Sequence, residues 1–205
     1  MNQWIDWVKR LQAISQTGKA YSKDKFDLER FDEIASISHQ MLAELAEEPV
    51  AKIENLFIPE SGYPTPKVDL RAGVIKDNKI LLVRERDDNC WTLPGGWADV
   101  CETPSQGIIR EVYEESGFKV CNPKLVAIKD RDSHPYIPRY AQHIYKFFFL
   151  CTFESGVPLT NIEISDIDFF ERDKLPELSK SRVLSDDIEL MFKHYQQPAS
   201  PVWVD

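Results

Sequence analysis

Apolar residues recur every three or four positions over the first 47 residues, and this spacing predicts two amphipathic helices. The first covers residues 2–17, and we expect Gly18 to end it. The second covers about residues 24–47, with Asp24 as N-cap and Pro49 marking its end. Two helices cannot enclose a core alone, so residues 1–60 are predicted to be a helical hairpin domain that makes a homodimer contact. The apolar residues available for that contact are Trp4, Trp7, Leu11, Phe31, Ile34 and Met41.

The pattern changes from helical to alternating after residues 59–66, whose prolines and glycine predict a linker. Alternation over residues 68–74, the turn pair Asp77-Asn78 and the apolar run 80–83 predict a strand, a turn and a strand. Further strands are expected near residues 91–93, 125–128, 144–153 and 167–170, helices at about 104–116 and 183–195, and an irregular tail from residue 198. Residues 61–205 are therefore predicted to form an α/β or α+β domain, a mixed sheet with flanking helices.

The helix expected at residues 104–116 has clear signals at both ends. Thr103 is a predicted N-cap, Pro104 takes the first helical position, and Gln106 completes a capping box with Thr103. Gly117 is placed to end the helix in the left-handed conformation.

Three glutamates crowd one face of this helix. Glu111 stands three residues before Glu114 and four before Glu115, so like charges are neighbours on the helix surface. At about 5 Å and an effective dielectric constant near 20, each such pair costs roughly 3 kcal/mol. A divalent cation such as Mg²⁺ or Mn²⁺ would offset this repulsion, because hard cations take carboxylate and backbone oxygens. The same three residues also fit a solvated acidic helix face.

The surrounding residues favour the metal. The segment matches G-x5-E-x7-R-E-U-x-E-E-x-G-U, where U is aliphatic or aromatic, at every specified position: Gly96, Glu102, Arg110, Glu111, Val112, Glu114, Glu115, Gly117 and Phe118. This pattern is the Nudix box, so the chain resembles Nudix hydrolases, which cleave a nucleoside diphosphate linked to another moiety X. The resemblance implies an α/β/α sandwich around a mixed sheet.

The resemblance also implies roles for the residues of the box. Glu111 and Glu115 are expected to be the main ligands of Mg²⁺ or Mn²⁺, with Glu114 assisting and the carbonyl of Gly95 or Gly96 adding a backbone ligand. Arg110 is expected to orient the glutamates and to pair with Glu102.

The likeness extends over the whole chain, through the helical hairpin and through segments at residues 62–71, 81–85, 91–100 and 130–132. It resembles a bacterial subfamily that acts on ADP-ribose or CDP-choline, and the favoured substrate is CDP-choline, giving CMP and phosphocholine. Cys101 departs from the glycine that is common at its position. The alternatives are ADP-ribose hydrolysis, trimming of short RNA 3′ ends, and a ligand-sensing module without catalysis.

Candidate substrate contacts lie outside the box. In the loop at residues 130–142, Arg131 and Arg139 could bind phosphate, and Tyr136 or Tyr140 could stack on a base, although an ordinary polar loop has the same composition. Other candidates are Arg71 and Arg84 for the diphosphate, and Glu163 as a distal ligand, a general base or an exposed loop residue.

Charge and composition narrow the range of partners. The net charge of −9 disfavours long nucleic acids, and no apolar run is long enough to cross a membrane. The four cysteines are scattered and read as reduced thiols, and the first 11 residues lack the features of a secretory signal, so a cytoplasmic location is expected.

Overall fold

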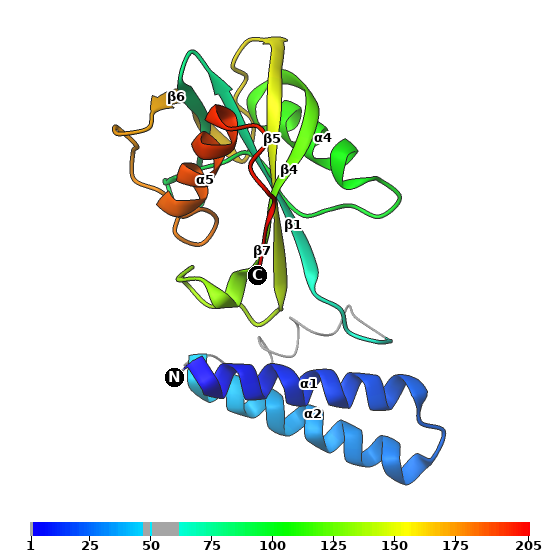
Figure 1. The fold of residues 1–205 in the computed structure, drawn as a ribbon. Coiled ribbons are helices and arrows are strands. Elements are labelled where there is room, and N and C mark those ends of the chain that lie inside the picture. The colour runs from blue at the N-terminus through cyan, green and yellow to red at the C-terminus, as the bar shows by residue number, and fades with distance from the viewer. Residues whose placement is uncertain (1, 47–49, 51–61) are drawn as a thin grey trace. The chain divides into compact units, whose positions relative to one another are not determined.

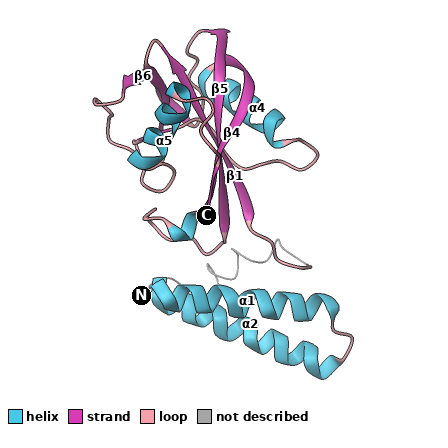
Figure 2. Ribbon diagram, viewed as in Figure 1, coloured by secondary structure: helices cyan, strands magenta, loops and turns pink. Residues whose placement is uncertain are grey.

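The computed structural model describes residues 2–46, 50 and 62–205, which form two units (Figures 1 and 2). One unit comprises Met1–Pro66 with Tyr140–His143, and the other comprises Lys67–Arg139 with Ile144–Asp205. The predicted domain boundary between residues 60 and 61 lies outside the described residues, as does the first part of the predicted linker. Residues 62–66 form neither helix nor strand. No described helix is long and apolar enough to cross a membrane.

The helical unit contains the two predicted helices, α1 (Asn2–Tyr21) and α2 (Lys25–Ala46). The predicted end of the first helix at Gly18 is wrong, because α1 continues for three more residues. A side chain at Gly18 would overlap the ring of Phe31, so this glycine permits close approach of the two helices. Asp24 caps α2 as predicted, since its Oδ1 accepts from the backbone N–H of Phe26 at 2.8 Å. Pro49, the predicted end, lies outside the described residues.

The core of the helical unit is small. Val8 of α1 packs with Leu42 and Ala43 of α2, and Ala141 packs against this cluster. The Nζ of Lys9 donates to the carbonyl of Gln142 at 3.2 Å. These contacts explain why residues 140–143 group with the helices rather than with their neighbours in sequence.

The second unit contains a mixed seven-stranded sheet, as predicted. Its strands are β1 (Lys67–Lys76), β2 (Lys79–Glu85), β3 (Trp91–Thr92), β4 (Phe118–Asp130), β5 (Ile144–Gly156), β6 (Ile164–Glu171) and β7 (Trp203–Val204). The order is β3-β2-β1-β5-β4-β7, with β6 also paired to β2. The central strand β1 runs antiparallel to β2 and parallel to β5.

One helix covers each face of this sheet (Figure 1). Alternate residues of β1 point to α4 (Pro104–Ser116), where Leu70, Ala72 and Val74 pack with Ile108 and Val112. The opposite face packs on α5 (Ser185–Gln196) through Phe148, Ile188 and Met191, among others. A short 3₁₀-helix, η1 (Arg131–Ser133), follows β4. The predicted α/β/α sandwich is confirmed.

The prediction of an irregular tail is wrong at its last residues. Trp203 and Val204 form β7, which pairs in parallel with Ala127 and Ile128 of β4. The Asp205 carboxylate then accepts from the backbone N–H of Asp130 at 2.9 Å. The preceding prolines suppress any local strand signal, and the pairing depends on a partner far away in sequence.

Candidate metal centre

The segment before α4 is fixed by backbone hydrogen bonds to β1. The N–H of Ala72 donates to the carbonyl of Pro94 at 2.9 Å, and that of Leu70 donates to the carbonyl of Gly96 at 2.8 Å. The N–H of Ala98 in turn donates to the carbonyl of Val68 at 2.9 Å. Gly95 and Gly96 are therefore held in register with the central strand of the sheet.

Helix α4 begins and ends where its sequence predicts. The Thr103 hydroxyl accepts from the N–H of Gln106 at 3.2 Å, and the Gln106 side chain accepts from the N–H of Thr103 at 2.9 Å, which is a complete capping box. Gly117 ends the helix with φ 74°, in the left-handed region that favours glycine. Both ends are thus determined locally, and they position the glutamates along the helix.

Glu115 lies against the segment Leu93–Gly96, which we call the glycine turn. It is 7% exposed. Its Oε2 accepts from the backbone N–H of Gly95 at 2.8 Å. Burial raises the pKa of this carboxyl to about 8, although the positive charge of Arg71 and the bond from Gly95 both act to lower it. The protein alone therefore does not compensate the charge of Glu115, and a cation beside it would.

Glu111 lies one helical turn earlier, against Gly96. A Cβ at Gly96 would stand 3.2 Å from both carboxylate oxygens of Glu111, so the glycine leaves room for this close approach. Burial raises the pKa of Glu111, and the neighbouring Arg110 opposes that shift. The two expected principal ligands thus converge on the same pair of glycines.

Arg110 contacts the acidic residues of the box together. Its Nε and Nη2 donate to the two oxygens of Glu102 at 3.1 and 2.9 Å, a bidentate pair of the kind expected from the sequence. Its Nη1 donates to both Glu111 and Glu114 at 2.9 Å. The bond from Arg110 lowers the pKa of Glu102. Glu114 is the outermost of the three, with a side chain 55% exposed.

The glutamates of the box carry the ligand atoms that a divalent cation requires. Glu111, which is partly buried, and Glu115, which is buried, supply carboxylate oxygens, the donors that Mg²⁺ and Mn²⁺ prefer. The N–H of Gly95 holds Glu115 and Arg110 holds both Glu111 and Glu114, and in the described structure the three glutamates do not gather within 4.8 Å of one another. Of the two candidate backbone ligands, the carbonyl of Gly96 already accepts from Leu70, which favours that of Gly95.

Glu85, a further buried carboxylate near this site, was not predicted. It ends β2, is 8% exposed and pairs with Nε of Arg182 at 3.1 Å. Burial raises the pKa of Glu85, and the charges of Arg182 and Arg71 oppose that shift. The available signal was an acidic residue two positions after the apolar run 80–83.

The structure buries three of the predicted substrate contacts. Arg71 is 6% exposed and bonds to Asp69 and to the carbonyl of Leu93. Arg131 is 1% exposed and donates to the carbonyl of Pro138 at 2.8 Å. Tyr136 is 0% exposed, and its hydroxyl donates to Asp187 at 2.6 Å. The predictions that Arg71 and Arg131 bind phosphate and that Tyr136 stacks on a base are therefore corrected, because these side chains are bonded inside the fold.

The remaining candidates lie nearer the surface. Arg84 donates to the carbonyl of Asn89 at 3.1 Å, and Arg139 contacts Asp132. The backbone N–H of Glu163 donates to the Asn161 side chain, and its carbonyl accepts from Arg86. Tyr140 belongs to the helical unit. None of these is brought against the box glutamates by a described contact.

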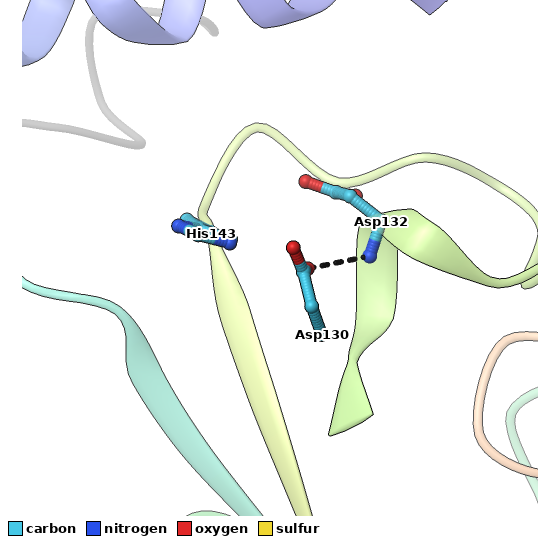
Figure 3. Close-up of side chains that lie close together, drawn as sticks. All are labelled: Asp130, Asp132 and His143. Atoms are coloured by element: carbon cyan, nitrogen blue, oxygen red, sulfur yellow. Dashed lines mark hydrogen bonds between the residues drawn. The ribbon is translucent and has the colours of Figure 1, made fainter. Parts of the chain in front are cut away.

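The loop that follows β4 is ordered by its own acidic residues. The Asp130 carboxylate accepts from the backbone N–H of Asp132 at 2.9 Å, which caps η1 (Figure 3). His143, also drawn there, belongs to the helical unit. Asp132 in turn contacts the guanidinium of Arg139. The predicted substrate loop is thus divided between the two units.

Comparison with known proteins identifies relatives for both parts of the chain. The family described as NUDIX domain matches residues 68–189, and the family described as UDP-X-like, N-terminal oligomerisation domain matches residues 2–57. A Bacillus subtilis (strain 168) protein provisionally named an ADP-ribose pyrophosphatase, YjhB, is 37% identical over 96% of this chain and 94% of its own length.

Two solved structures are similar as well. A UDP-X diphosphatase is 33% identical, with a TM-score of 0.64 over 99% of this chain and 98% of that one. An ADP-ribose pyrophosphatase from Streptococcus suis 89-1591 is 34% identical, with a TM-score of 0.63 over 69% of this chain and all of that one. The same family is indicated by the two family matches, by the relative that covers 96% of this chain, and by the helix that carries the three glutamates. The chain therefore belongs to the Nudix family and is a Nudix pyrophosphohydrolase.

Proposed function

We propose that this enzyme uses Mg²⁺ or Mn²⁺ to hydrolyse the diphosphate bond of a nucleoside diphosphate linked to X. The observation that supports this is the convergence of Glu111 and Glu115 on Gly95 and Gly96, with Arg110 tying Glu111 to Glu102. When bound, the metal would neutralise the diphosphate and lower the pKa of a bound water. Water then adds across the P–O–P bond and releases a nucleoside monophosphate and phospho-X.

CDP-choline, giving CMP and phosphocholine, is the substrate favoured by the sequence resemblance. ADP-ribose is the second candidate, because the names of the relatives in Bacillus subtilis and Streptococcus suis point to it. The presence of all the box carboxylates supports a hydrolase over a ligand-sensing module. Trimming of short RNA 3′ ends would use the same carboxylates, whereas the charge of −9 disfavours long RNA.

A substrate panel tests this proposal. CDP-choline, ADP-ribose, a UDP-sugar and a short RNA are each incubated with the full-length protein and Mg²⁺ or Mn²⁺, and chromatography identifies the products. We expect cleavage of at least one diphosphate substrate, abolished by a chelator and by Glu115→Gln. Glu114→Gln is the matched variant, the same chemical change on an exposed side chain, and we expect a smaller loss. Absence of metal-dependent cleavage across the panel would overturn the proposal.

We also propose that the helical hairpin joins two copies of the chain. Trp4 and Trp7 are 50% and 39% exposed, and Ile14 is 54% exposed on the same helix. Such an apolar surface supports an interface, as does the family description of residues 2–57. Light scattering on Trp7→Lys should report a monomer. Trp203→Lys changes a 53% exposed tryptophan of the other unit and should remain a dimer. A monomeric parent protein would refute the interface.

A further inference from the structure

Arg71 belongs to a buried group of charges on the α5 face of the sheet. Its Nε donates to both oxygens of Asp69 at 3.1 Å, and its Nη2 donates to Oδ1 at 2.8 Å. Lys146 of β5 contacts the other oxygen of the same carboxylate. The side chains of Asp69 and Arg71 are 7% exposed and that of Lys146 is 2% exposed. The planar guanidinium is therefore fixed in orientation, because its donors form a rigid fork.

The third nitrogen of the guanidinium, Nη1, bonds to the glycine turn. Nη1 of Arg71 donates to the carbonyl of Leu93 at 3.2 Å. Two residues later, the N–H of Gly95 donates to Glu115. Arg71 thus joins Asp69 of β1 to the start of the turn whose other contact holds Glu115. Lys146 has the same carboxylate partner, but its described contacts do not extend to that turn.

We propose that Arg71 is a positioning residue of the metal centre, which holds the Leu93–Gly95 backbone where Glu115 can bind the cation. The inference rests on the proposed function, since it assigns Arg71 a part in that same metal site. It replaces the contact with the diphosphate predicted from sequence, because the three nitrogens of Arg71 are already bonded within the fold. Arg71 acts through the turn and touches neither substrate nor metal.

Arg71→Lys is the informative variant. Lysine keeps the positive charge beside Glu115, so the charge acting on the site is largely retained. A point charge on a flexible stem cannot bond Asp69 and the Leu93 carbonyl with the geometry of the fork. The difference between parent and variant therefore measures positioning rather than charge.

Mn²⁺ affinity is measured on the full-length protein from the electron paramagnetic resonance signal of free Mn²⁺. A thermal melt of each sample measures its stability. We expect Arg71→Lys to weaken Mn²⁺ binding about tenfold, the lower end of the effect of residues that orient metal ligands. At saturating Mn²⁺ the Michaelis constant of the best substrate should be unchanged. Lys146→Met is the matched control, since it removes an equally buried cation from the same carboxylate, and it should leave Mn²⁺ affinity within about twofold of the parent while lowering the melting temperature.

The outcomes separate the two proposals. If the parent binds no Mn²⁺, the proposed function fails whatever Arg71 does. If the parent binds Mn²⁺ and Arg71→Lys binds it equally well, Arg71 is only structural and the inference is overturned. Equal weakening by Lys146→Met would also overturn it, because general damage to the buried charges would then explain both. A raised Michaelis constant at saturating metal would restore the substrate-contact role. If Arg71→Lys does not fold, Arg71→Met is measured in the same way, and unchanged Mn²⁺ affinity in that variant overturns the inference.

Discussion

Replacing Glu115 by glutamine should have opposite effects on activity and on the stability of the metal-free protein. The variant keeps the shape of the side chain, and its amide oxygen can still accept from the N–H of Gly95. It loses a buried charge that the site requires if it binds a cation. Turnover should fall by roughly a thousandfold or more, since metal activation of water supplies several kcal/mol of the barrier reduction.

The magnitude of the stability effect follows from the pKa of Glu115, which rises from an ordinary 4.5 to about 8 in the fold because of burial. A raised pKa in the folded state means that the contribution of this group to stability is complete below pH 4.5 and is lost as the pH rises to about 8. Each pH unit in that window costs up to about 1.4 kcal/mol. Between pH 5 and pH 8 the metal-free parent should therefore lose on the order of 3 kcal/mol relative to Glu115→Gln.

Urea unfolding in the presence of a chelator, at pH 5 and at pH 8, measures this difference. We expect the variant to be the more stable protein at pH 8 and the gap to narrow at pH 5. Added Mg²⁺ should stabilise the parent more than the variant, because binding to the folded state alone shifts the equilibrium. Glu114→Gln serves as the control, because it makes the same chemical change on an exposed side chain.

Two results would refute this reasoning. Parallel pH profiles for the parent and Glu115→Gln would show that the fold compensates the charge of Glu115. Activity within about tenfold of the parent would show that Glu115 is not a principal ligand.

Three further predictions concern the frame around the site. Thr103→Ala should cost about 1 kcal/mol of unfolding free energy, measured in urea, because α4 loses its N-cap, and an unchanged midpoint would contradict this. Tyr136→Phe should lower stability by about 1–3 kcal/mol, because the buried Asp187 carboxylate loses one of its three donors and keeps Lys129 and the N–H of Leu184, while the Michaelis constant stays constant; a raised constant would return Tyr136 to the substrate site. Gly18→Ala should destabilise the protein by about 1–3 kcal/mol through overlap with Phe31, although alanine favours helices, and a higher melting temperature would show that the helices can separate.

The sequence predictions were accurate where the residues that determine a feature lie close together in the sequence. Helix α4 was predicted with both of its ends because Thr103, Gln106 and Gly117 act within one turn of the residues they cap. The hairpin of β1 and β2 followed for the same reason, from a turn pair between two apolar runs. The pairing of Arg110 with Glu102 came from the family resemblance and spans only eight residues.

Predictions were wrong where a distant segment determines the outcome. Gly18 was taken as a helix end because its contact with Phe31 exists only after α1 and α2 pack together. The burial of Tyr136 was not predicted, because its partner Asp187 lies 51 residues later. Glu85 lies outside the box, and only the fold brings it within electrostatic range of Arg71.

The pairing of β1 with β5 has a consequence for the order of folding. The hairpin of β1 with β2 and the glycine turn are close in sequence, so they can form early. Lys146 of β5 lies 77 residues beyond Asp69, and contacts over such a distance form slowly. Until β5 pairs with β1, one edge of β1 is unpaired and Asp69 lacks one of its two cations. A partly folded chain with such an edge is prone to aggregate. A nascent chain released before residue 144 would hold every residue of the box and still lack the strand that completes the sheet beneath it.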